Sequence, residues 1–472
     1  MNENPYMKLA KFILPSEMTE YFDLVDVALD QYDDEQRLHL YLDEKDVKPK
    51  DQPEAKSNGF YEESCINDFP IREYRTVLHV RRRRWKDVGG KSVSKDWQLV
   101  AKGTRYSKEF ATFLKEFLGY IPITARSLQK PYHIKGDEFE RAYKDHLSDF
   151  RTWKHKSHAQ KWLIFPRNIG PNLSIDETAL SNGDLYTIIS NKDAHGRKGA
   201  LVAVINGTKV EDVVEAVMQI HWYLRCKVRE VTMDFSEGMH QIVMRCFPNA
   251  TITLDRFHMQ QLVTDAMQEL RIKHKREEQK AQNEQRKFFK EQLKEKYERS
   301  LKRRKKNRKD KRGRKPIRKN KAFVPERLSN GDTVPELISR SRYSLMVSGD
   351  RWTATQKERM KLLFERYPDI KEAYSIVHSL RMIFSNQKAT CISAYESLQK
   401  WYEKVKAFDN DSFNTAADTI RNREDEVLNY FIHRATNASA ESLNSKIKHF
   451  RAQLRGVVDV DFFLYRLSMI FG

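Results

Sequence analysis

The stretch LSIDETALSNGDLYTIIS, residues 173–190, decides the fold expected for this chain. Two segments of strand-forming residues flank Ser181-Asn182-Gly183, and an Asn-Gly pair tolerates the positive φ angles of a tight hairpin turn. These segments therefore predict two strands joined as a hairpin. A third apolar segment, ALVAVI at 200–205, predicts the next strand.

Strands and helices alternate after this hairpin. Thr208 and Glu211 fit a capping box that would start a helix running to about residue 224. VREVTMD at 228–234 predicts a strand, EGMHQIVMRCF at 237–247 a helix, and ATITLD at 250–255 a further strand. The resulting order, βββαβαβ, is typical of an α/β mixed sheet with crossover helices.

The charge of the chain is concentrated in one segment. Among 472 residues there are 86 Lys and Arg against 66 Asp and Glu, a net charge of +20 that favours a negatively charged partner. Residues 271–321 hold most of this excess, and the part at 302–321 contains almost nothing apolar, so we expect the run at a surface or in a mobile loop. Two interpretations of this run are a clamp on the DNA backbone and a solvated, disordered linker, and the two are compatible. Hydrophobic residues make up 39% of the chain, which excludes a wholly disordered polycation.

Cysteine usage and hydropathy narrow the class of protein further. The four cysteines, Cys65, Cys226, Cys246 and Cys391, form no CxxC pair, so a zinc ribbon or a redox dithiol is not expected. No stretch approaches the roughly 18 to 20 apolar residues of a membrane span. We therefore expect a cytoplasmic protein with reduced cysteines and no membrane partner.

The N-terminal third has two predicted parts. YRTVLHVRRRRW at 74–85, a turn at Val88-Gly89-Gly90 and DWQLVAKG at 96–103 predict a basic β-ribbon. Residues 123–147 show two short helical patterns around a turn at 132–136, which fit either a helix-turn-helix or an ordinary pair of packed helices.

The C-terminal half is predicted to be mainly helical. Capping signals mark helix starts at Thr353 and at Pro368-Asp369, and the last predicted helix runs from about Asn437 to Arg455 before Gly456. The expected division is 1–105 with the β-ribbon, 106–165 with the helix-turn-helix, 166–270 as the first part of the sheet domain, 271–330 as a basic helix or linker, 331–434 as a helical insertion, and 435–472 as the last part of the sheet domain.

Three carboxylates occupy informative places in this pattern. Asp176 is predicted to end the first strand, Asp234 the fourth, and Glu441 lies on the last helix. Carboxylates brought together at strand ends repel one another unless a divalent cation is bound, and oxygen ligands suit Mg²⁺ or Mn²⁺. The alternative is that these acids are caps or solvated loop residues. Helical spacing places Glu441 on one side of its helix with Asn444, Lys448, Arg451 and Arg455, which could hold phosphates or could form an ordinary solvated face.

The residues also carry a family resemblance. LSIDETALSNGDLYTII, VREVTMDFSEGMHQIVMRCFPNATITLDRFHMQQL, WTATQKERMKLLFERYPDIKEAY and NASAESLNSKIKHFRAQLRGVVDVDFF resemble segments of bacterial insertion-sequence DDE transposases of the ISL-three group. This resemblance implies an RNase H-like catalytic domain (βββαβ-α-β-α) that is interrupted by an all-α insertion and preceded by a DNA-binding region.

The resemblance implies roles for individual residues. Asp176, Asp234 and Glu441 resemble the three catalytic carboxylates that hold two Mg²⁺ ions, with Mn²⁺ as a substitute. Asp255-Arg256-Phe257-His258 resembles a D-R-F-H signature beside the active site. It makes Asp255 an alternative second ligand, and Arg256 and His258 contacts to DNA; a structural histidine at a helix start is the other interpretation of His258.

The N-terminal resemblance is looser. IREYRTVLHVRRRRW resembles an arginine-rich ribbon, so Arg81, Arg82, Arg83 and Arg84 are predicted DNA contacts, and strand alternation would send neighbouring arginines to opposite faces. The cysteine pairs of the related zinc-binding module are missing, so we expect this region to be metal-free.

The family implies a transposase that binds terminal inverted repeats, cleaves DNA and joins it to a target, acting as a dimer or larger assembly on double-stranded DNA. Two alternatives remain. One is a descendant that only binds DNA, and the other is a nuclease that cuts without joining.

Overall fold

The structure is a computed structural model that describes Leu9 and residues 12–32, 35–49, 52–95, 97–181, 183–306 and 322–472. The chain divides into two compact units. The first comprises Met1–Val231, Gly238–Ala250 and Asn437–Gly472, and the second comprises Thr232–Glu237 and Thr251–Thr436. Each unit is described separately below.

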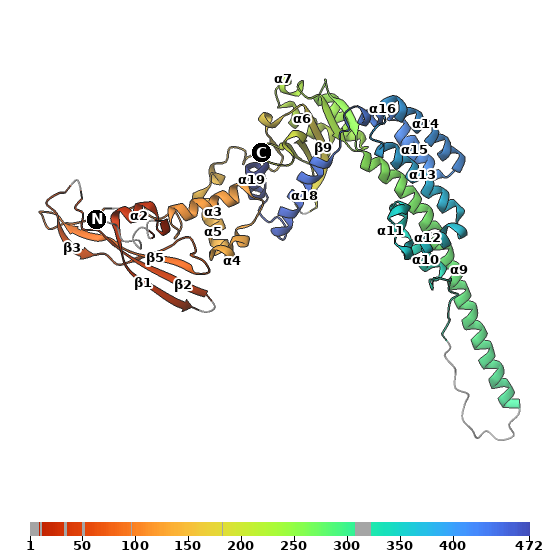
Figure 1. Cartoon of the computed structure of the whole chain (residues 1–472), viewed down its shortest axis with the longest axis horizontal. Coiled ribbons are helices and arrows are strands. Elements are labelled where there is room, and N and C mark those ends of the chain that lie inside the picture. The colour runs from red at the N-terminus through yellow and green to blue at the C-terminus, as the bar shows by residue number, and fades with distance from the viewer. Residues whose placement is uncertain are drawn as a thin grey trace. The chain divides into compact units, whose positions relative to one another are not determined.

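The first unit begins with a β-rich region that the sequence predicted only in part (Figure 1). Its elements are α2 (Ser16–Tyr21), β1 (Phe22–Tyr32), β2 (Glu35–Glu44), β3 (Lys56–Phe60), β4 (Ser64–Asn67), β5 (Arg75–Arg81), β6 (Arg83–Lys86) and β7 (Ser92–Val93). One sheet has the order β1-β2-β5-β4, and a smaller one has the order β3-β6-β7. Leu40, Leu42, Leu78 and Val80 alternate along β2 and β5 and form the core of the four-stranded sheet with α2.

The predicted ribbon is present in a shorter form. β6 pairs antiparallel with β7 across the predicted turn, where Gly90 takes a φ of +76° that favours glycine. The prediction of a returning strand at 96–103 was wrong. The strand that returns is Ser92–Val93, and residues 97–99 have irregular backbone because Leu99 turns inward to the core of the four-stranded sheet.

A set of short helices follows the β-rich region. They are α3 (Lys108–Tyr120), η1 (Ala125–Leu128), α4 (Gln129–Tyr132), α5 (Gly136–Ala142), η2 (Tyr143–Leu147) and η3 (Phe150–Thr152). The predicted turn between Tyr132 and Gly136 is confirmed. A Cβ on Gly136 would lie 2.8 Å from the Cα of Arg126, so only glycine allows this close approach. A helix-turn-helix role for α4 and α5 stays a prediction.

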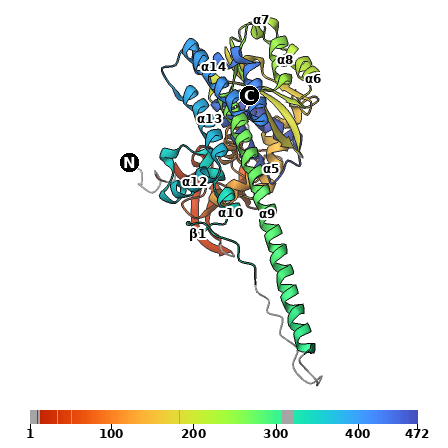
Figure 2. The same ribbon diagram turned by 90° about the vertical axis from the view of Figure 1, so that its right-hand side faces the viewer.

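The elements of the central sheet and its helices are β8 (Trp162–Ile164), η4 (Pro166–Asn168), β9 (Asn172–Ser181), β10 (Asp184–Asn191), η5 (Lys192–Ala194), β11 (Leu201–Asn206), α6 (Val210–Met218), α7 (Trp222–Arg225), β12 (Glu230–Met233), α8 (Glu237–Cys246) and β13 (Thr251–Leu254). They follow the predicted order from β9 to β13, but β8 was not predicted, and the helix predicted to run to about residue 224 is divided into α6 and α7. The strand order is β13-β12-β9-β10-β11-β8. β9 and β10 pair antiparallel, which confirms the hairpin; Asn182 of its predicted turn lies outside the described residues. Figure 2 shows α6, α7 and α8 gathered beside this sheet.

One predicted helix start was wrong. α6 begins at Val210, and its N-cap residue is Lys209, which makes no capping hydrogen bond through its side chain. Glu211 does not close a capping box with Thr208, because its carboxylate instead accepts two hydrogen bonds from the guanidinium of Arg245 on α8.

Two C-terminal helices complete the first unit. α18 (Ala438–Gln453) is the predicted last helix, and Gly456, with a φ of +106°, follows its end. α19 (Val460–Phe471) was not predicted. Eight of its twelve residues are buried, and seven of them belong to the same core as residues of β10, β11, α3 and α18. The eighth is Arg466, and its guanidinium donates to the carbonyls of Ile121 and Ile123.

The second unit is built around α9 (Arg256–Lys306). Its other helices are α10 (Val334–Arg340), α11 (Arg342–Met346), η6 (Gly349–Arg351), α12 (Ala354–Arg366), α13 (Pro368–Ser385), α14 (Cys391–Phe408), α15 (Asp411–Arg421), α16 (Glu424–Leu428) and α17 (Tyr430–His433). The helix starts predicted at Thr353 and Pro368 are confirmed. Helices α10, α13 and α15 pack on the first part of α9, and its remainder projects from them (Figure 1). The basic run is helical as far as Lys306; residues 307–321 lie outside the described residues.

Among the residues that the structure describes, no helix has both the length and the apolarity needed to cross a membrane.

Candidate active site

Asp176 was predicted to end the first strand of the hairpin, and this prediction was wrong. It lies in the middle of β9. Asp176 pairs with Ile188 of β10, and β9 continues beyond it to Ser181, where the hairpin turn begins. Ser174, Asp176 and Thr178 share one face of the strand, since side chains alternate. Ser174 and Thr178 are buried, whereas Asp176 is half-buried. The carboxylate of Asp176 is therefore the most accessible of these three polar side chains.

Helix α18 is held along this face of β9 by side-chain hydrogen bonds. The amide of Asn444 donates to Oδ2 of Asp176 at 2.5 Å, and the guanidinium of Arg451 donates to the carbonyl of Ala179 at 2.9 Å. Seven helical residues rise about 10.5 Å and three strand residues rise about 10 Å. The distance between the two hydrogen bonds is therefore nearly the same along the helix and along the strand, so α18 runs parallel to β9 over this length.

The first turns of α18 are fixed separately. Ser439 donates to the carbonyl of Lys192 at 3.1 Å, and the ammonium of Lys446 donates to the carbonyl of Gly196 at 2.7 Å. Glu441 lies in the first turn between these anchors and is exposed. It is three residues before Asn444, and side chains at this spacing share a helix face. Glu441 and the residue that binds Asp176 are thus on the same side of α18.

The predicted two-sided character of α18 holds with one correction. Leu443, Ile447 and Phe450 are buried in the core as predicted. Asn444 was placed on a solvated cationic face, but it is buried because it packs under Asp176; it is a partner of a carboxylate and not an exposed DNA contact. Arg451 is half-buried and bound to β9.

A second group of acids lies in the second unit, after β12 and β13. Asp234 follows β12 directly, which confirms the prediction that it ends the fourth strand, and Asp255 follows β13. The amide of Asp255 donates to the carbonyl of Met233 at 2.9 Å, which aligns the two strand ends. Nε2 of His258 lies 2.9 Å from Oδ1 of Asp234 and 4.0 Å from Oδ2 of Asp255.

These three side chains could hold a metal ion. The ligand atoms of Asp234, Asp255 and His258 all lie within 4.8 Å of one another. Asp255 is almost fully buried, whereas Asp234 and His258 are partly exposed. Two carboxylates about 4 Å apart repel by about 4 kcal/mol at an effective dielectric constant of about 20, and a cation removes that repulsion. Carboxylate oxygens are also the ligands that Mg²⁺ and Mn²⁺ prefer, so the donor set fits either metal.

Other predicted DNA contacts differ in exposure. Arg256 is half-buried and donates to the hydroxyl of Tyr430 in the second unit at 3.2 Å, so part of its hydrogen-bonding capacity is already used. Lys448 and Arg455 are exposed, and Arg455 lies beyond the end of α18. Of these cations, Lys448 and Arg455 are the ones that the structure leaves accessible to a phosphate.

The arginines of the N-terminal ribbon alternate as predicted. Arg81 and Arg83 lie over the ring of Phe60, and Arg82 and Arg84 lie over the ring of Tyr61. Arg81 also forms a bidentate ion pair with Asp43, and the backbone and guanidinium of Arg83 bind Glu44. Trp85, the next residue along β6, is fully buried.

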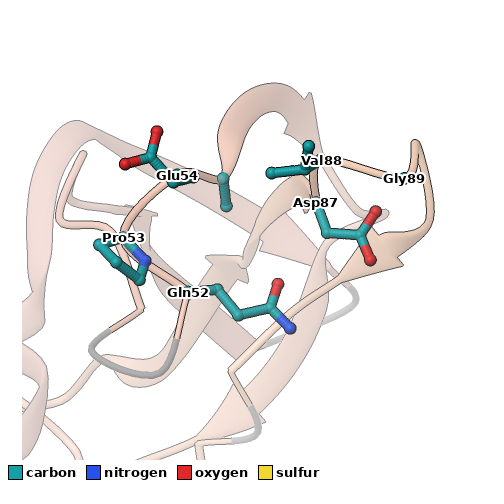
Figure 3. Close-up of a pocket in the computed structure, with 7 residues that line it drawn as sticks. Gln52, Pro53, Glu54, Asp87, Val88 and Gly89 are labelled. Atoms are coloured by element: carbon teal, nitrogen blue, oxygen red, sulfur yellow. The ribbon is translucent and has the colours of Figure 1, made fainter.

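The turn of this ribbon borders a pocket (Figure 3). Residues 52–55 and Asp87, Val88 and Gly89 line it. Its ionisable side chains, Glu54 and Asp87, are both acidic, so this pocket does not suit a phosphate. None of the predicted site residues lines it.

Comparison with known families identifies the group to which this architecture belongs. A family model described as "Transposase", that of the ISL-three group of DDE transposases, matches residues 173–467, more than half of the chain. The chain belongs to the ISL-three family of DDE transposases. The match begins in β9 of the transposase and ends in α19, so it includes Asp176, Asp234, Asp255 and Glu441. No curated protein matches the transposase.

Sequence reasoning missed one partner in the candidate site of the transposase. The hydrogen bond from Asn444 to Asp176 joins residues 268 positions apart, and amphipathic periodicity assigned Asn444 to the wrong face. The sequence contained no local signal for this bond, because helical spacing places Asn444 among the polar residues of α18 and its partner lies far away in the chain.

Proposed function

We propose that this transposase binds the terminal inverted repeats of an insertion sequence and catalyses metal-dependent DNA cleavage and strand transfer. Asp176, Asp234 and Glu441 are the proposed catalytic carboxylates, and Mg²⁺ is the proposed cofactor, as two ions. The observation that carries this proposal is the hydrogen bond between Asn444 and Asp176, because it ties the helix that bears Glu441 to the strand that bears Asp176.

The arrangement of strands supports an RNase H-like catalytic domain. Three antiparallel strands, β11, β10 and β9, are followed in the sheet order by β12 and β13, and β8 lies at the other edge next to β11. From β9 to β13 the strands and crossover helices alternate in the chain in the order expected for this fold, with α7 as an additional short helix after α6. The helices of the second unit occur in the sequence between β13 and α18, as expected for a helical insertion. This architecture supports the assignment of Asp176 and Asp234 to neighbouring strands.

The proposed carboxylates would hold the divalent ions as oxygen ligands. When bound, such ions activate an attacking hydroxyl or water and stabilise the leaving oxygen of a phosphodiester. Asn444 keeps Oδ2 of Asp176 in one orientation by donating to it. His258 lies beside Asp234, where it orients that carboxylate, and Asp255 is the alternative ligand on the same side.

The proposed DNA contacts lie in two regions, one near the helix that bears Glu441 and one in the N-terminal ribbon. Lys448 and Arg455 are exposed cations on and beyond the helix that bears Glu441, so they suit backbone phosphates near the site. Arg81 to Arg84 are proposed contacts of the N-terminal ribbon, with their guanidinium planes held by Phe60 and Tyr61. Because two transposon ends must be joined, we also propose that the protein acts as a dimer or larger assembly on DNA.

Cleavage and joining assays on DNA that carries the element's own ends test this proposal. Asp176→Asn, Asp234→Asn and Glu441→Gln should each abolish Mg²⁺-dependent cleavage and strand transfer, because an amide is a neutral and weaker ligand. End binding, measured by gel shift, should stay close to that of the unaltered protein.

Asp212→Asn is the matched control, since Asp212 is an exposed carboxylate on α6. It should keep full activity. Full activity in any of the three site variants would remove that residue from the site. Binding without cleavage by the unaltered protein would favour the DNA-binding descendant, and cleavage without joining would favour the nuclease.

A further inference from the structure

A second cluster of side chains that could bind a metal lies at the four-stranded N-terminal sheet, about 100 or more residues before the proposed catalytic residues in the sequence. Nδ1 of His79 on β5 lies 3.1 Å from Oε1 of Glu63 and 3.6 Å from Sγ of Cys65 on β4. The ligand atoms of all three lie within 4.8 Å of one another. β4 and β5 pair so that Cys65 is directly opposite His79, which fixes the two side chains on the same face of the sheet.

We propose that Glu63, Cys65 and His79 bind a zinc ion. In a tetrahedral site with bond lengths of about 2.0 Å to oxygen and nitrogen and about 2.3 Å to sulfur, the oxygen–nitrogen edge is roughly 3.3 Å and the nitrogen–sulfur edge roughly 3.6 Å. The distances of 3.1 and 3.6 Å around Nδ1 of His79 are close to these edges. A thiolate, an imidazole and a carboxylate together favour Zn²⁺ over Mg²⁺.

The surroundings of His79 orient it as a ligand. Its other ring nitrogen, Nε2, lies 2.7 Å from Nδ1 of His39 on β2, which is a hydrogen bond between the rings. Metal-bound histidines commonly donate their second N–H in this way, which leaves the first nitrogen free to bind the ion. The ring of Tyr41 stacks on His79 with centroids 4.5 Å apart and holds its plane. His79 itself is 9% exposed, so its ring has little freedom to turn.

The accessibility of the cluster suits an ion that enters from solvent. Glu63 and Cys65 are exposed, and His79 is behind them. Three protein ligands leave a fourth position for water or for another ligand. The ion would join the segment before β4 and the edge strand β4 to the neighbouring strand β5. This inference revises the expectation that the N-terminal region is metal-free, which considered only sets of cysteines.

Cobalt substitution tests the site with a direct signature of the thiolate. Metal-stripped full-length protein is titrated with Co²⁺, and absorption is recorded in the near ultraviolet, where a Cys-to-cobalt charge-transfer band appears, and in the visible. We expect one thiolate-bound Co²⁺ per chain, displaced by one equivalent of Zn²⁺. The carboxylate sites of the second unit contain no cysteine and cannot give this band.

Three variants make the test specific. Cys65→Ser should lose the band, whereas the control Cys226→Ser should keep it, since Cys226 is outside the cluster. His39→Phe removes the acceptor of the His79 N–H and should weaken Co²⁺ binding by about 10- to 100-fold while keeping the band. Circular dichroism verifies that each variant is folded. Absence of the band in folded unaltered protein, or its persistence in Cys65→Ser, would overturn the proposal.

Discussion

Replacement of Asn444 by Leu tests how α18 is held on β9. Leucine has a similar size and suits the neighbouring core of Leu443 and Ile447, so the main change is loss of the donor to Asp176. Hydrogen bonds to charged groups contribute about 1.5–3 kcal/mol. A loss of about 2 kcal/mol corresponds to roughly 4–8 °C in Tm, because 1 kcal/mol shifts Tm by about 2–4 °C in a folding unit of 150–250 residues.

The assay is thermal unfolding followed by urea unfolding of the full chain. Asn206→Leu is the matched control: Asn206 is exposed, and its amide donates at 3.1 Å to the neutral carbonyl of Gln160. Its loss should cost no more than about 1 kcal/mol. DNA cleavage by Asn444→Leu should also fall, since Asp176 loses the group that orients it. If Asn444→Leu is as stable and as active as Asn206→Leu, the bond does not hold the helix on the strand and the argument for the site fails.

Two further predictions concern acid stability and salt. Burial lowers the pKa of His378 to about 4 from its usual 6.5, with Arg381 acting in the same direction, so the folded state resists a proton that the unfolded chain accepts. The free energy of unfolding should therefore fall as the pH drops from about 6.5 to about 4. In urea titrations at pH 4.5 and 7.5, His378→Gln should show a smaller difference in this free energy between the two pH values. If the variant shows the same difference as the unaltered protein, the prediction is contradicted. Lys290, Lys294 and Lys296 are exposed on α9, and each one that contacts a phosphate contributes about −0.9 to the slope of log K against log salt. Changing all three to Gln should make the measured slope less steep by up to about 2.7, and an unchanged slope would show that this part of α9 does not contact DNA.

The sequence predicted the central sheet well because its signals are local. The segment 173–190 carries alternating and apolar residues around Asn-Gly, and these depend only on neighbours a few positions away. The same holds for Thr353 and Pro368, whose helix starts require only the next three residues. Each of these predictions was confirmed.

The errors arose where a distant partner competed with a local signal. Glu211 fitted a capping box by spacing, but in the folded chain the guanidinium of Arg245 lies within reach and donates two hydrogen bonds to its carboxylate. Asn444 belonged to the polar side of α18 by helical angle, yet it is buried under Asp176. α19 was missed because it is apolar on nearly all sides, so it lacks the periodicity by which a surface helix is recognised.

The N-terminal cluster shows a further kind of omission. Glu63, Cys65 and His79 have no metal-ligand spacing in the sequence, and only the pairing of β4 with β5 brings them together. A motif search examines short intervals, whereas a sheet can assemble a ligand set from any strands that share a face.

The single helix α9 sets a distance within the second unit. His258 is in its first turn, and exposed lysines and arginines follow from Lys273 to Arg303. At 1.5 Å per residue, the 45 steps from His258 to Arg303 correspond to about 68 Å, and at 3.4 Å per base pair this is roughly 20 base pairs, or two turns of B-DNA. A duplex lying along α9 would present the same groove at both ends of that interval. If DNA lies along α9, the length of the helix would determine how far apart the phosphates are that its cations can contact at the same time.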